Sequence, residues 1–354
     1  MNALEFFAGI GLVRLALRNA GWAVVFANDI DPKKHQIYKA NFGSHDFKLA
    51  DIADIKASKL PSAELATASF PCIDLSLAGN RAGLSGHYSS VFWQFYRLLV
   101  EMKQRAPRYV LIENVTGLLT SHGGKDLKAI LESLNAKGYF CDLLVVDAVN
   151  FVPQSRPRLF ILGDREPDGN GFALLARHPA RPEGVLRFMA SFPKLKWHHF
   201  ELPALPSRSK ALAEVLEHFC PTDPIWWDKD KAQHLSDQMS PAHALRLKEL
   251  SRLEQATFVT VYKRVRPSGC RAELRFDGVA GCLRTPRGGS SKQFVICAGH
   301  GTWRVRNMTA REYARLQGVP DAFKITVPYN QALWGFGDAV CVPAVSWIVR
   351  HCFR

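Results

Sequence analysis

Ala3-Leu-Glu-Phe-Phe-Ala-Gly-Ile-Gly11 joins a short apolar run to a Gly-x-Gly turn. Residues 12–20 follow with apolar side chains at helical spacing. Glycines in this place allow a tight turn and let a ligand approach the backbone. The stretch therefore predicts the first strand, turn and helix of a Rossmann-like α/β fold, with a ligand close to the turn.

The same succession of elements continues to residue 165. Five more apolar runs read as buried strands: residues 23–27, 65–70, 109–112, 143–146 and 159–162. Three more segments show helical spacing: residues 32–41, 90–103 and 125–137. Strands that alternate with helices predict a doubly wound, mostly parallel sheet covered by helices on both faces. Ligands bind such sheets beyond the carboxyl ends of the strands, so the residues just after each strand are the candidates for a binding site.

The regular pattern fails beyond residue 165, where Pro, His and paired aromatic residues follow one another without clear periodicity. Order returns at Thr309-Ala-Arg-Glu312, a capping box that opens a helix, and an apolar helix over 339–352 closes the chain. We therefore expect a catalytic and cofactor-binding domain at 1–165, a smaller irregular domain at 166–280, and a segment at 281–354 that returns to the first domain.

Composition restricts the class of protein. The chain has 354 residues, of which 47% are hydrophobic, and a mean hydropathy of -0.08, so disorder, collagen and coiled coil all fit poorly. No apolar run reaches the roughly 18 residues that cross a bilayer, and no basic signal begins the chain, so we expect a soluble, cytoplasmic protein. The eight cysteines include no Cys-x2-Cys pair, so no metal site is expected and most thiols should be reduced.

The net charge of +14 is unevenly distributed. Residues 1–170 carry 19 basic and 17 acidic side chains, residues 171–278 carry 17 and 12, and residues 279–354 carry 10 and 3. A basic half joined to a nearly neutral half suggests a polyanion, most often nucleic acid, held against one face. A solvated surface that favours solubility is the alternative, and charge alone does not decide between the two.

The end of the second strand carries a carboxylate. Asp29 lies twenty residues beyond Gly9, the offset expected of an acid that binds ribose hydroxyls. A dinucleotide fingerprint would have Gly or Ala at position 14, where this chain has Arg14. A nucleoside cofactor without a pyrophosphate satisfies both observations, and S-adenosylmethionine is the common one. A similar turn without any cofactor remains the alternative.

A cysteine follows the strand at 65–70. Cys72 leads into a glycine-spaced stretch over 76–90, which places it like a nucleophile under a mobile lid. Most single cysteines are instead packed thiols.

Charged residues flank two later strands. Glu113 follows the strand at 109–112, where a carboxylate either has a partner or binds in its protonated form, unless it is a plain helix cap. Arg156 and Arg158 stand on alternate positions before the last strand of the domain, so both could reach one site or meet surface carboxylates.

These elements, in this order, resemble the DNA (cytosine-5)-methyltransferase family of bacterial modification enzymes. The resemblance covers nearly the whole chain and rests on these motifs: Phe7-Ala-Gly-Ile-Gly11, Asp29, Asp51-Ile52, Ser69-Phe-Pro-Cys72, Glu113-Asn-Val115, Gln154-Ser-Arg-Pro-Arg158, Thr309-Ala-Arg-Glu-Tyr-Ala-Arg-Leu-Gln-Gly318 and Gly337-Asp-Ala-Val340. It implies a class I methyltransferase fold, with residues 166–280 as the target recognition domain. The implied reaction is methylation of carbon 5 of cytosine in a specific duplex DNA sequence.

The resemblance also implies roles for individual residues. Cys72 would attack carbon 6 of a flipped-out cytosine, Glu113 would bind ring nitrogen 3 and the exocyclic amine, and Arg156 and Arg158 would stabilise charge near the base carbonyl. Residues implied for the S-adenosylmethionine site, which would release S-adenosylhomocysteine, are Phe7, Ala8, Gly9, Gly11, Asp29, Ile30, Asp51, Ile52, Pro71, Val91, Asp338, Ala339 and Val340. Residues expected to contact DNA are Ser76, Arg81 and Gln154.

Two positions depart from the family pattern. Ile73 stands where Gln is frequent, which we expect to alter loop contacts and not the chemistry. Asp338 stands where Asn is usual, and a carboxylate there would either repel the carboxylate of the cofactor or pair with its ammonium group.

The expected partners are double-stranded DNA and a cognate restriction endonuclease that acts on the same sequence. We expect no contact with a membrane, and we expect the protein to be a monomer. Three alternatives remain open: an enzyme of the same fold that methylates transfer RNA, a catalytically silent nucleic-acid-binding protein, and a nicotinamide oxidoreductase.

Overall fold

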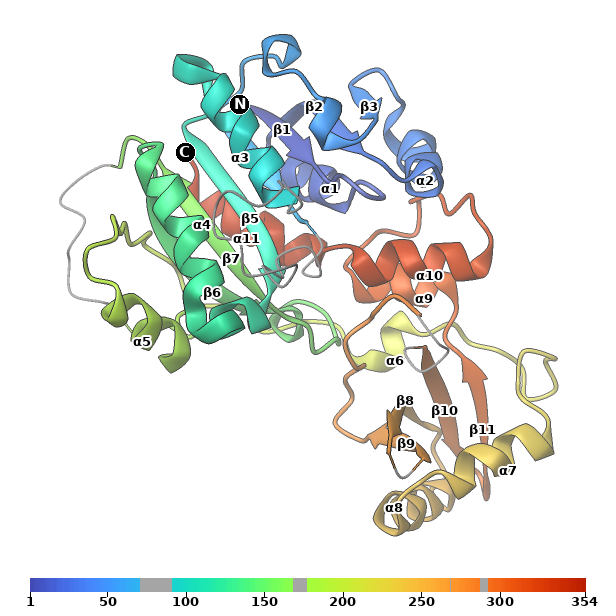
Figure 1. Ribbon diagram of the computed structural model, residues 1–354. Coiled ribbons are helices and arrows are strands. Elements are labelled where there is room, and N and C mark those ends of the chain that lie inside the picture. Colours follow the sequence, from blue (N-terminus) through green and yellow to red (C-terminus); the bar gives the residue numbers. More distant parts are fainter. Residues whose placement is uncertain (71–90, 168–176, 268, 287–291) are drawn as a thin grey trace. The chain divides into compact units, whose positions relative to one another are not determined.

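A computed structural model describes residues 1–70, 91–167, 177–267, 269–286 and 292–354. The chain forms two compact units (Figure 1). The first unit comprises Met1–Asp147, Pro157–Leu205 and Val342–Arg354, and the second comprises Ala148–Arg156 and Pro206–Cys341.

The first unit contains a seven-stranded sheet in the order β3-β2-β1-β4-β5-β7-β6. Its strands are β1 (Asn2–Phe6), β2 (Ala23–Asp29), β3 (Phe47–Leu49), β4 (Leu65–Ala68), β5 (Tyr109–Val115), β6 (Phe140–Asp147) and β7 (Pro157–Asp164). All neighbouring strands are parallel except β7, which is antiparallel to both β5 and β6. The strand order reverses between β1 and β4, and such a switch point opens a crevice at the carboxyl ends of the strands.

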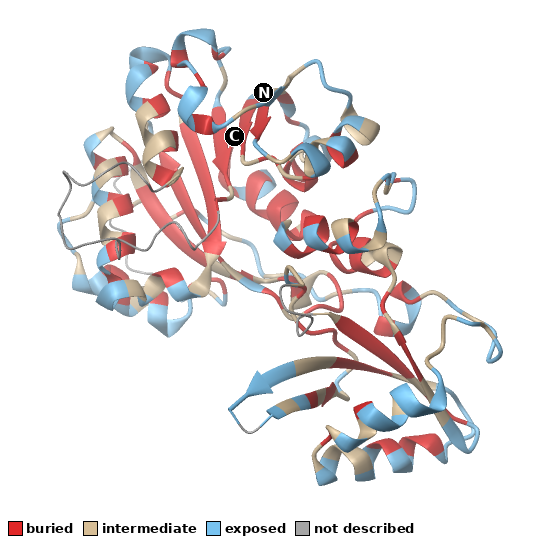
Figure 2. Ribbon diagram, turned by 45° about the vertical axis from the view of Figure 1, so that its right-hand side comes forward, coloured by how far each residue is buried: buried red, intermediate tan, exposed pale blue. Residues whose placement is uncertain are grey.

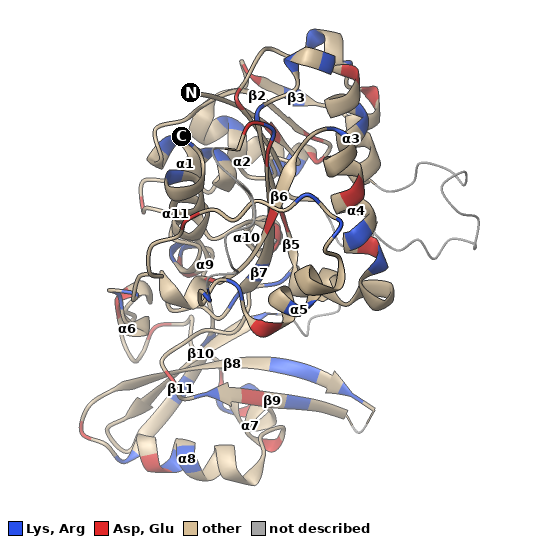
Figure 3. Ribbon diagram, turned by 90° about the vertical axis from the view of Figure 1, so that its left-hand side faces the viewer, with Lys and Arg blue, Asp and Glu red and all other residues tan. Residues whose placement is uncertain are grey.

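Helices cover both faces of this sheet (Figure 3). Those of the first unit are α1 (Leu12–Asn19), α2 (Pro32–Phe42), α3 (Val91–Glu101), α4 (Lys125–Ala136), α5 (Glu183–Ser191) and α11 (Val342–Cys352). Helices α1, α2 and α11 lie on one side of the sheet, and α3, α4 and α5 lie on the other. The Ser346 hydroxyl of α11 donates to the carbonyl of Ala16 in α1 at 3.0 Å, so the last helix of the chain is fastened to the first.

Strands β4 to β7 of the first unit are buried along most of their length (Figure 2). All four residues of β4 are buried, as expected for a central parallel strand covered by helices on both faces. Phe92 and Phe95 of α3 and Ile130 of α4 are also buried, in the core on one face of the sheet. Each such side chain contributes about 1.5–3 kcal/mol by leaving water.

The second unit is built on a four-stranded antiparallel sheet in the order β11-β10-β8-β9. Its elements are α6 (Leu212–Val215), α7 (Lys229–Asp237), α8 (Pro241–Ser251), β8 (Thr257–Arg266), β9 (Gly269–Arg275), β10 (Gln293–Gly299), β11 (Thr302–Asn307), α9 (Ala310–Leu316) and α10 (Tyr329–Asp338). Thr309 caps α9 with the expected capping box, because its hydroxyl accepts from the Glu312 N–H while the Glu312 carboxylate accepts from the Thr309 N–H.

The doubly wound, mostly parallel sheet expected from the sequence is confirmed. The unit boundaries differ from those expected at 165 and 280. The first unit continues to Leu205 because the chain after β7 returns to its edge strand, where the Cys141 N–H donates to the Lys196 carbonyl at 2.9 Å. The second unit ends at Cys341 and passes the expected limit at 280, because β10 (Gln293–Gly299) pairs with β8 (Thr257–Arg266).

One segment, Tyr329–Cys352, is long and apolar enough to cross a membrane among the residues that the structure describes. It is divided between α10 of the second unit and α11 of the first, and 78% of its most apolar window is buried. Its apolar composition is therefore explained by packing inside the protein.

Candidate active site

The turn after β1 and the end of β2 are joined through one carboxylate. The Gly9 N–H donates to Oδ2 of Asp29 at 2.7 Å, and the Asp31 N–H donates to its Oδ1 at 2.8 Å. Gly9 and Gly11 have φ of +55° and +86°, and a Cβ on Gly11 would lie 2.5 Å from the Phe42 ring. The sequence Gly-x-Gly is therefore required by the turn and by packing, and it presents a fixed carboxylate at the carboxyl edge of the sheet.

The short strand β3, which the sequence did not predict, places the expected cofactor residues Asp51 and Ile52 beside the end of β2. The Asn28 side-chain amide donates to the carbonyls of Lys48 and Ala50 at 3.0 and 2.8 Å, which ties β2 to the segment after β3. Asp51 follows at once, with its Oδ1 accepting from the Ala53 N–H at 2.8 Å. Ile30 is 63% exposed, so an apolar surface lies at the end of β2.

The end of β4 is anchored from the neighbouring strand. The Asn114 side-chain amide donates to the Phe70 carbonyl at 3.1 Å, and the Phe70 ring meets the Phe7 ring edge-on at 6.1 Å between centroids. Val91 begins α3 and is partly buried. The predicted nucleophile Cys72, together with Pro71, Ser76 and Arg81, lies outside the described residues.

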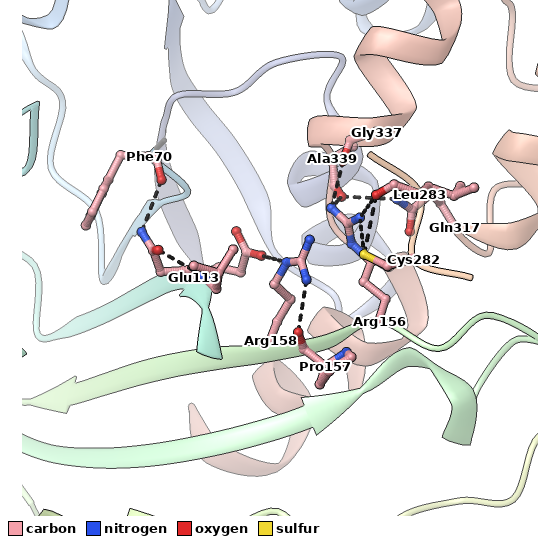
Figure 4. A network of polar contacts seen from close by, with 12 residues as sticks. Phe70, Glu113, Arg156, Pro157, Arg158, Cys282, Leu283, Gln317, Gly337 and Ala339 are labelled. Atoms are coloured by element: carbon pink, nitrogen blue, oxygen red, sulfur yellow. Dashed lines mark hydrogen bonds and ion pairs between the residues drawn. The ribbon is translucent and has the colours of Figure 1, made fainter. Parts of the chain in front are cut away.

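An acid and a guanidinium meet on the neighbouring strands β5 and β7. Nε of Arg158 lies 3.1 Å from Oε1 of Glu113, and both side chains are largely buried (Figure 4). The antiparallel register, which pairs Val115 with Arg158, brings the two side chains together. The Glu113 carboxylate therefore has an ion-pair partner, which is one of the two alternatives that the sequence left open. Such a pair can present both an acceptor and donors to a planar polar ring.

Arg156 has a different environment from Arg158. It is 2% exposed and belongs to the second unit, where its guanidinium donates to the carbonyls of Leu283, Gly337 and Ala339 at 2.5, 3.0 and 2.7 Å (Figure 4). Strand alternation does not apply to this pair of arginines, because β7 begins at Pro157. These contacts favour a positioning role for Arg156 over the expected contact with a base.

Gln154 is also buried in the second unit, with 0% exposure. Its amide nitrogen donates to the Leu316 carbonyl at 2.7 Å, and its oxygen accepts from the Leu283 N–H at 3.1 Å. Both ends of the side chain are thus used inside the protein, which favours a structural role for Gln154 over the expected DNA contact.

Sequence reasoning missed Glu5, which lies fully buried in β1 beneath the glycine turn. Its Oε1 accepts from the Arg14 N–H in the first turn of α1 at 3.0 Å, and the Tyr38 hydroxyl lies 3.4 Å from its Oε2. Burial raises the pKa of Glu5 to about 8, and the charge of Asp29 adds to the rise. A lone acid inside an apolar strand was the signal that could have identified it.

Glu5 should make stability fall as pH rises. The carboxyl has an ordinary pKa of 4.5 and a folded pKa of about 8, so the folded state holds an extra proton between these values. The free energy of unfolding then decreases by about 5 kcal/mol across this range. Glu5→Gln keeps the acceptor for Arg14 without titrating. Denaturant unfolding should show the variant gaining stability over the wild type at pH 8.5 and not at pH 4.5, and a difference independent of pH would contradict this.

Comparison with known proteins gives consistent results. The family model described as C-5 cytosine-specific DNA methylase matches residues 1–354. The type II methyltransferase M.NgoBI of Neisseria gonorrhoeae is 28% identical over 352 residues, which cover 99% of this chain and 92% of the relative. M.HaeII of Haemophilus aegyptius is 28% identical over 350 residues, which cover 98% of this chain and 91% of the relative.

Solved structures share the fold. The crystal structure of the S. pombe Dnmt2 methyltransferase aligns with a TM-score of 0.63 at 19% identity, over 99% of this chain and 97% of that one. The Entamoeba histolytica methyltransferase EhMeth aligns with a TM-score of 0.61 at 14% identity, over 99% and 97%. At these identities the likeness concerns the fold, which matches that of a class I methyltransferase.

Proposed function

The chain belongs to the family of C-5 cytosine-specific DNA methylases, and on this premise we propose that it methylates a specific duplex sequence by Cys72 attack on a flipped-out cytosine, with S-adenosylmethionine as methyl donor. Its activity as a DNA cytosine-5 methyltransferase follows from the family and from the relatives. The observation that carries the proposed mechanism is the Glu113–Arg158 pair at the carboxyl end of β5. The neighbouring strand β4 is the one that leads to Cys72.

The residues around the glycine turn fit S-adenosylmethionine. Each Asp29 oxygen accepts one backbone N–H and retains a lone pair for a ribose hydroxyl, while the exposed Ile30 offers an apolar surface to the adenine ring. Arg14, which counted against a dinucleotide, donates to the Tyr38 hydroxyl at 2.9 Å and is held inside the unit. When bound, the cofactor supplies an electrophilic methyl group.

We assign the remaining residues implied by the family resemblance to the same cofactor site. In the first unit they are Phe7, Ala8, Gly9, Gly11, Asp51, Ile52, Pro71 and Val91. In the second unit they are Asp338, Ala339 and Val340.

The side chains of this protein have separate tasks in the reaction. Carbon 5 of cytosine is a poor nucleophile, and addition of the Cys72 thiolate to carbon 6 turns the ring into an enamine that reacts at carbon 5. Glu113 binds ring nitrogen 3 and the exocyclic amine, where negative charge is relieved, and Arg158 orients Glu113 and faces the base carbonyl. Once carbon 5 is methylated, loss of its proton and departure of Cys72 restore aromaticity.

The base must leave the duplex for this addition, which costs a few kcal/mol of unstacking. We assign Ser76 and Arg81, in the stretch that follows Cys72, to phosphate contacts around the extruded nucleotide.

A basic ribbon of the second unit supports duplex DNA as the substrate (Figure 3). Among the described strands, β8 pairs with β10 as far as Tyr262, so its last residues pair with β9 alone. Arg264 and Arg271 stand directly opposite each other there, although opposed like charges destabilise a sheet. A polyanion would relieve that repulsion, and the DNA major groove admits a two-stranded ribbon.

Neutralising these two arginines should change the salt dependence of DNA binding. For the Arg264→Gln, Arg271→Gln double variant we expect weaker binding and a salt slope shallower by about 2, because two fewer phosphate contacts release counterions. Fluorescence anisotropy between 50 and about 200 mM salt measures the slope. Arg246→Gln, which alters an exposed arginine of α8 paired with Glu249, is the matched control. Equal slopes for the double variant and the control would exclude the ribbon from the interface.

Bisulfite sequencing of plasmid DNA from cells that express the chain tests the proposed function. Methylated cytosines confined to one short sequence are the expected result. A parallel assay of labelled methyl transfer compares duplex DNA with transfer RNA, and methylation of RNA alone would overturn the choice of substrate.

The relatives are named type II methyltransferases, and we infer a cognate restriction endonuclease that cuts the same sequence. We also infer a monomer that acts on DNA in the cytoplasm.

A further inference from the structure

Within the second unit, the end of α10 rests directly on the backbone of the segment 282–286. A Cβ built on Gly337 would lie 2.5 Å from the carbonyl carbon of Arg284 and 2.7 Å from the amide nitrogen of Thr285. No side chain therefore fits between the two stretches of backbone, and the position requires glycine.

Buried donors fasten the same two segments together. Arg156 donates both to the Leu283 carbonyl and to the carbonyls of Gly337 and Ala339 (Figure 4). The Gln317 side-chain amide adds bonds to the Phe336 and Ala339 carbonyls at 2.7 and 3.1 Å. Arg156 is buried and hydrogen-bonded to both segments, so it holds them together, while Gln317 secures the end of α10.

The position that departs from the family pattern lies at this junction. The Thr285 hydroxyl donates to Oδ1 of Asp338 at 2.8 Å. An ionised carboxylate only accepts hydrogen bonds, so the hydroxyl of Thr285 is a matched donor for it. The hydroxyl of Thr285 thus holds one oxygen of the Asp338 carboxylate.

We propose that Thr285 is a positioning residue that orients Asp338 to bind the ammonium group of the amino-acid end of the cofactor. The inference rests on the proposed function, in which Asp338 belongs to the S-adenosylmethionine site. Of the two ends of an amino-acid zwitterion, only the ammonium group donates hydrogen bonds, so a carboxylate acceptor fits it and repels the other. Thr285 also lies between β9 and β10 along the chain, so its bond to Asp338 joins the antiparallel sheet of the second unit to the end of α10.

Binding of S-adenosylhomocysteine to the full chain, measured by calorimetry, tests this without turnover. Asp338→Asn should weaken binding about tenfold, the effect of one charge-assisted hydrogen bond. Thr285→Val should weaken it about threefold, and Thr285→Ser should restore it, because only the hydroxyl is needed. In the Asp338→Asn background, Thr285→Val should have a smaller effect than in the wild type. Thr302→Val, at an exposed threonine of β11, is the matched control and should bind like the wild type.

The results distinguish a failure of this inference from a failure of the proposed function. Tighter binding by Asp338→Asn would show that the carboxylate repels the cofactor and would overturn the inference. Additive effects in the double variant, or wild-type binding by Thr285→Val, would remove Thr285 from this role. In either case the wild type would still bind the probe and methylate DNA, whereas a wild type that does neither contradicts the proposed function itself.

Discussion

The Cys72→Ser variant is expected to lose methyl transfer to duplex DNA by a factor of about a thousand or more. A serine hydroxyl is not ionised near neutral pH, so it does not add to carbon 6, and without that addition carbon 5 does not attack the donor. Affinity for DNA and for S-adenosylhomocysteine should persist, because the exchange of sulfur for oxygen is nearly isosteric. Labelled methyl transfer in single turnover, with binding measured separately, distinguishes lost chemistry from lost affinity.

Cys220→Ser provides the matched control, since Cys220 is an exposed thiol of the second unit. It should turn over at the wild-type rate. Turnover retained by Cys72→Ser, or lost equally in both variants, would refute Cys72 as the nucleophile.

Glu113→Gln should produce the second largest loss, a fall in kcat of about a hundredfold to a thousandfold. The amide keeps the shape of the side chain but not the charge that pairs with Arg158, nor the carboxyl group that we propose relieves charge at ring nitrogen 3. The interaction matters most while the base carries charge, so kcat should fall while the DNA dissociation constant changes little.

Glu101→Gln is the control for this substitution, because Glu101 forms a comparable ion pair with Arg97 on the surface of α3. It should leave kcat unchanged. If Glu113→Gln raised the DNA dissociation constant and left kcat intact, Glu113 would be a binding residue without a part in the chemistry.

The sheet could be read from the sequence because its central strands are short apolar runs separated by helical periodicity. The expected strand at 65–70 and β4 (Leu65–Ala68) illustrate the agreement. By contrast, β3 (Phe47–Leu49) has three residues and no fully buried one, so no hydrophobic pattern marks it. The domain limits also escaped prediction, since pairing between β8 and β10 depends on contacts distant in sequence.

The polar residues also divide into those whose place the sequence predicted and those whose place it did not. Glu113 and Arg158 were expected near one site, and an antiparallel register that local sequence does not encode brings them together. Arg156 sits two residues from Arg158, yet the chain passes from one unit to the other between them, and its donors are used by backbone carbonyls. Glu5 was missed because the apolar residues on either side of it predicted the strand, and the single acid among them was not considered further.

The most direct test of this chemistry is to detect a covalent complex with duplex DNA that contains 5-fluorocytosine at the methylated position. With fluorine on carbon 5, the methylated adduct has no proton to lose, so Cys72 cannot depart. After incubation with S-adenosylmethionine and digestion, mass spectrometry should find the modified nucleotide on the peptide that carries Cys72, and none with Cys72→Ser. Wild-type protein that methylates ordinary DNA but forms no adduct, or forms it at another residue, would contradict Cys72 attack as the basis of catalysis.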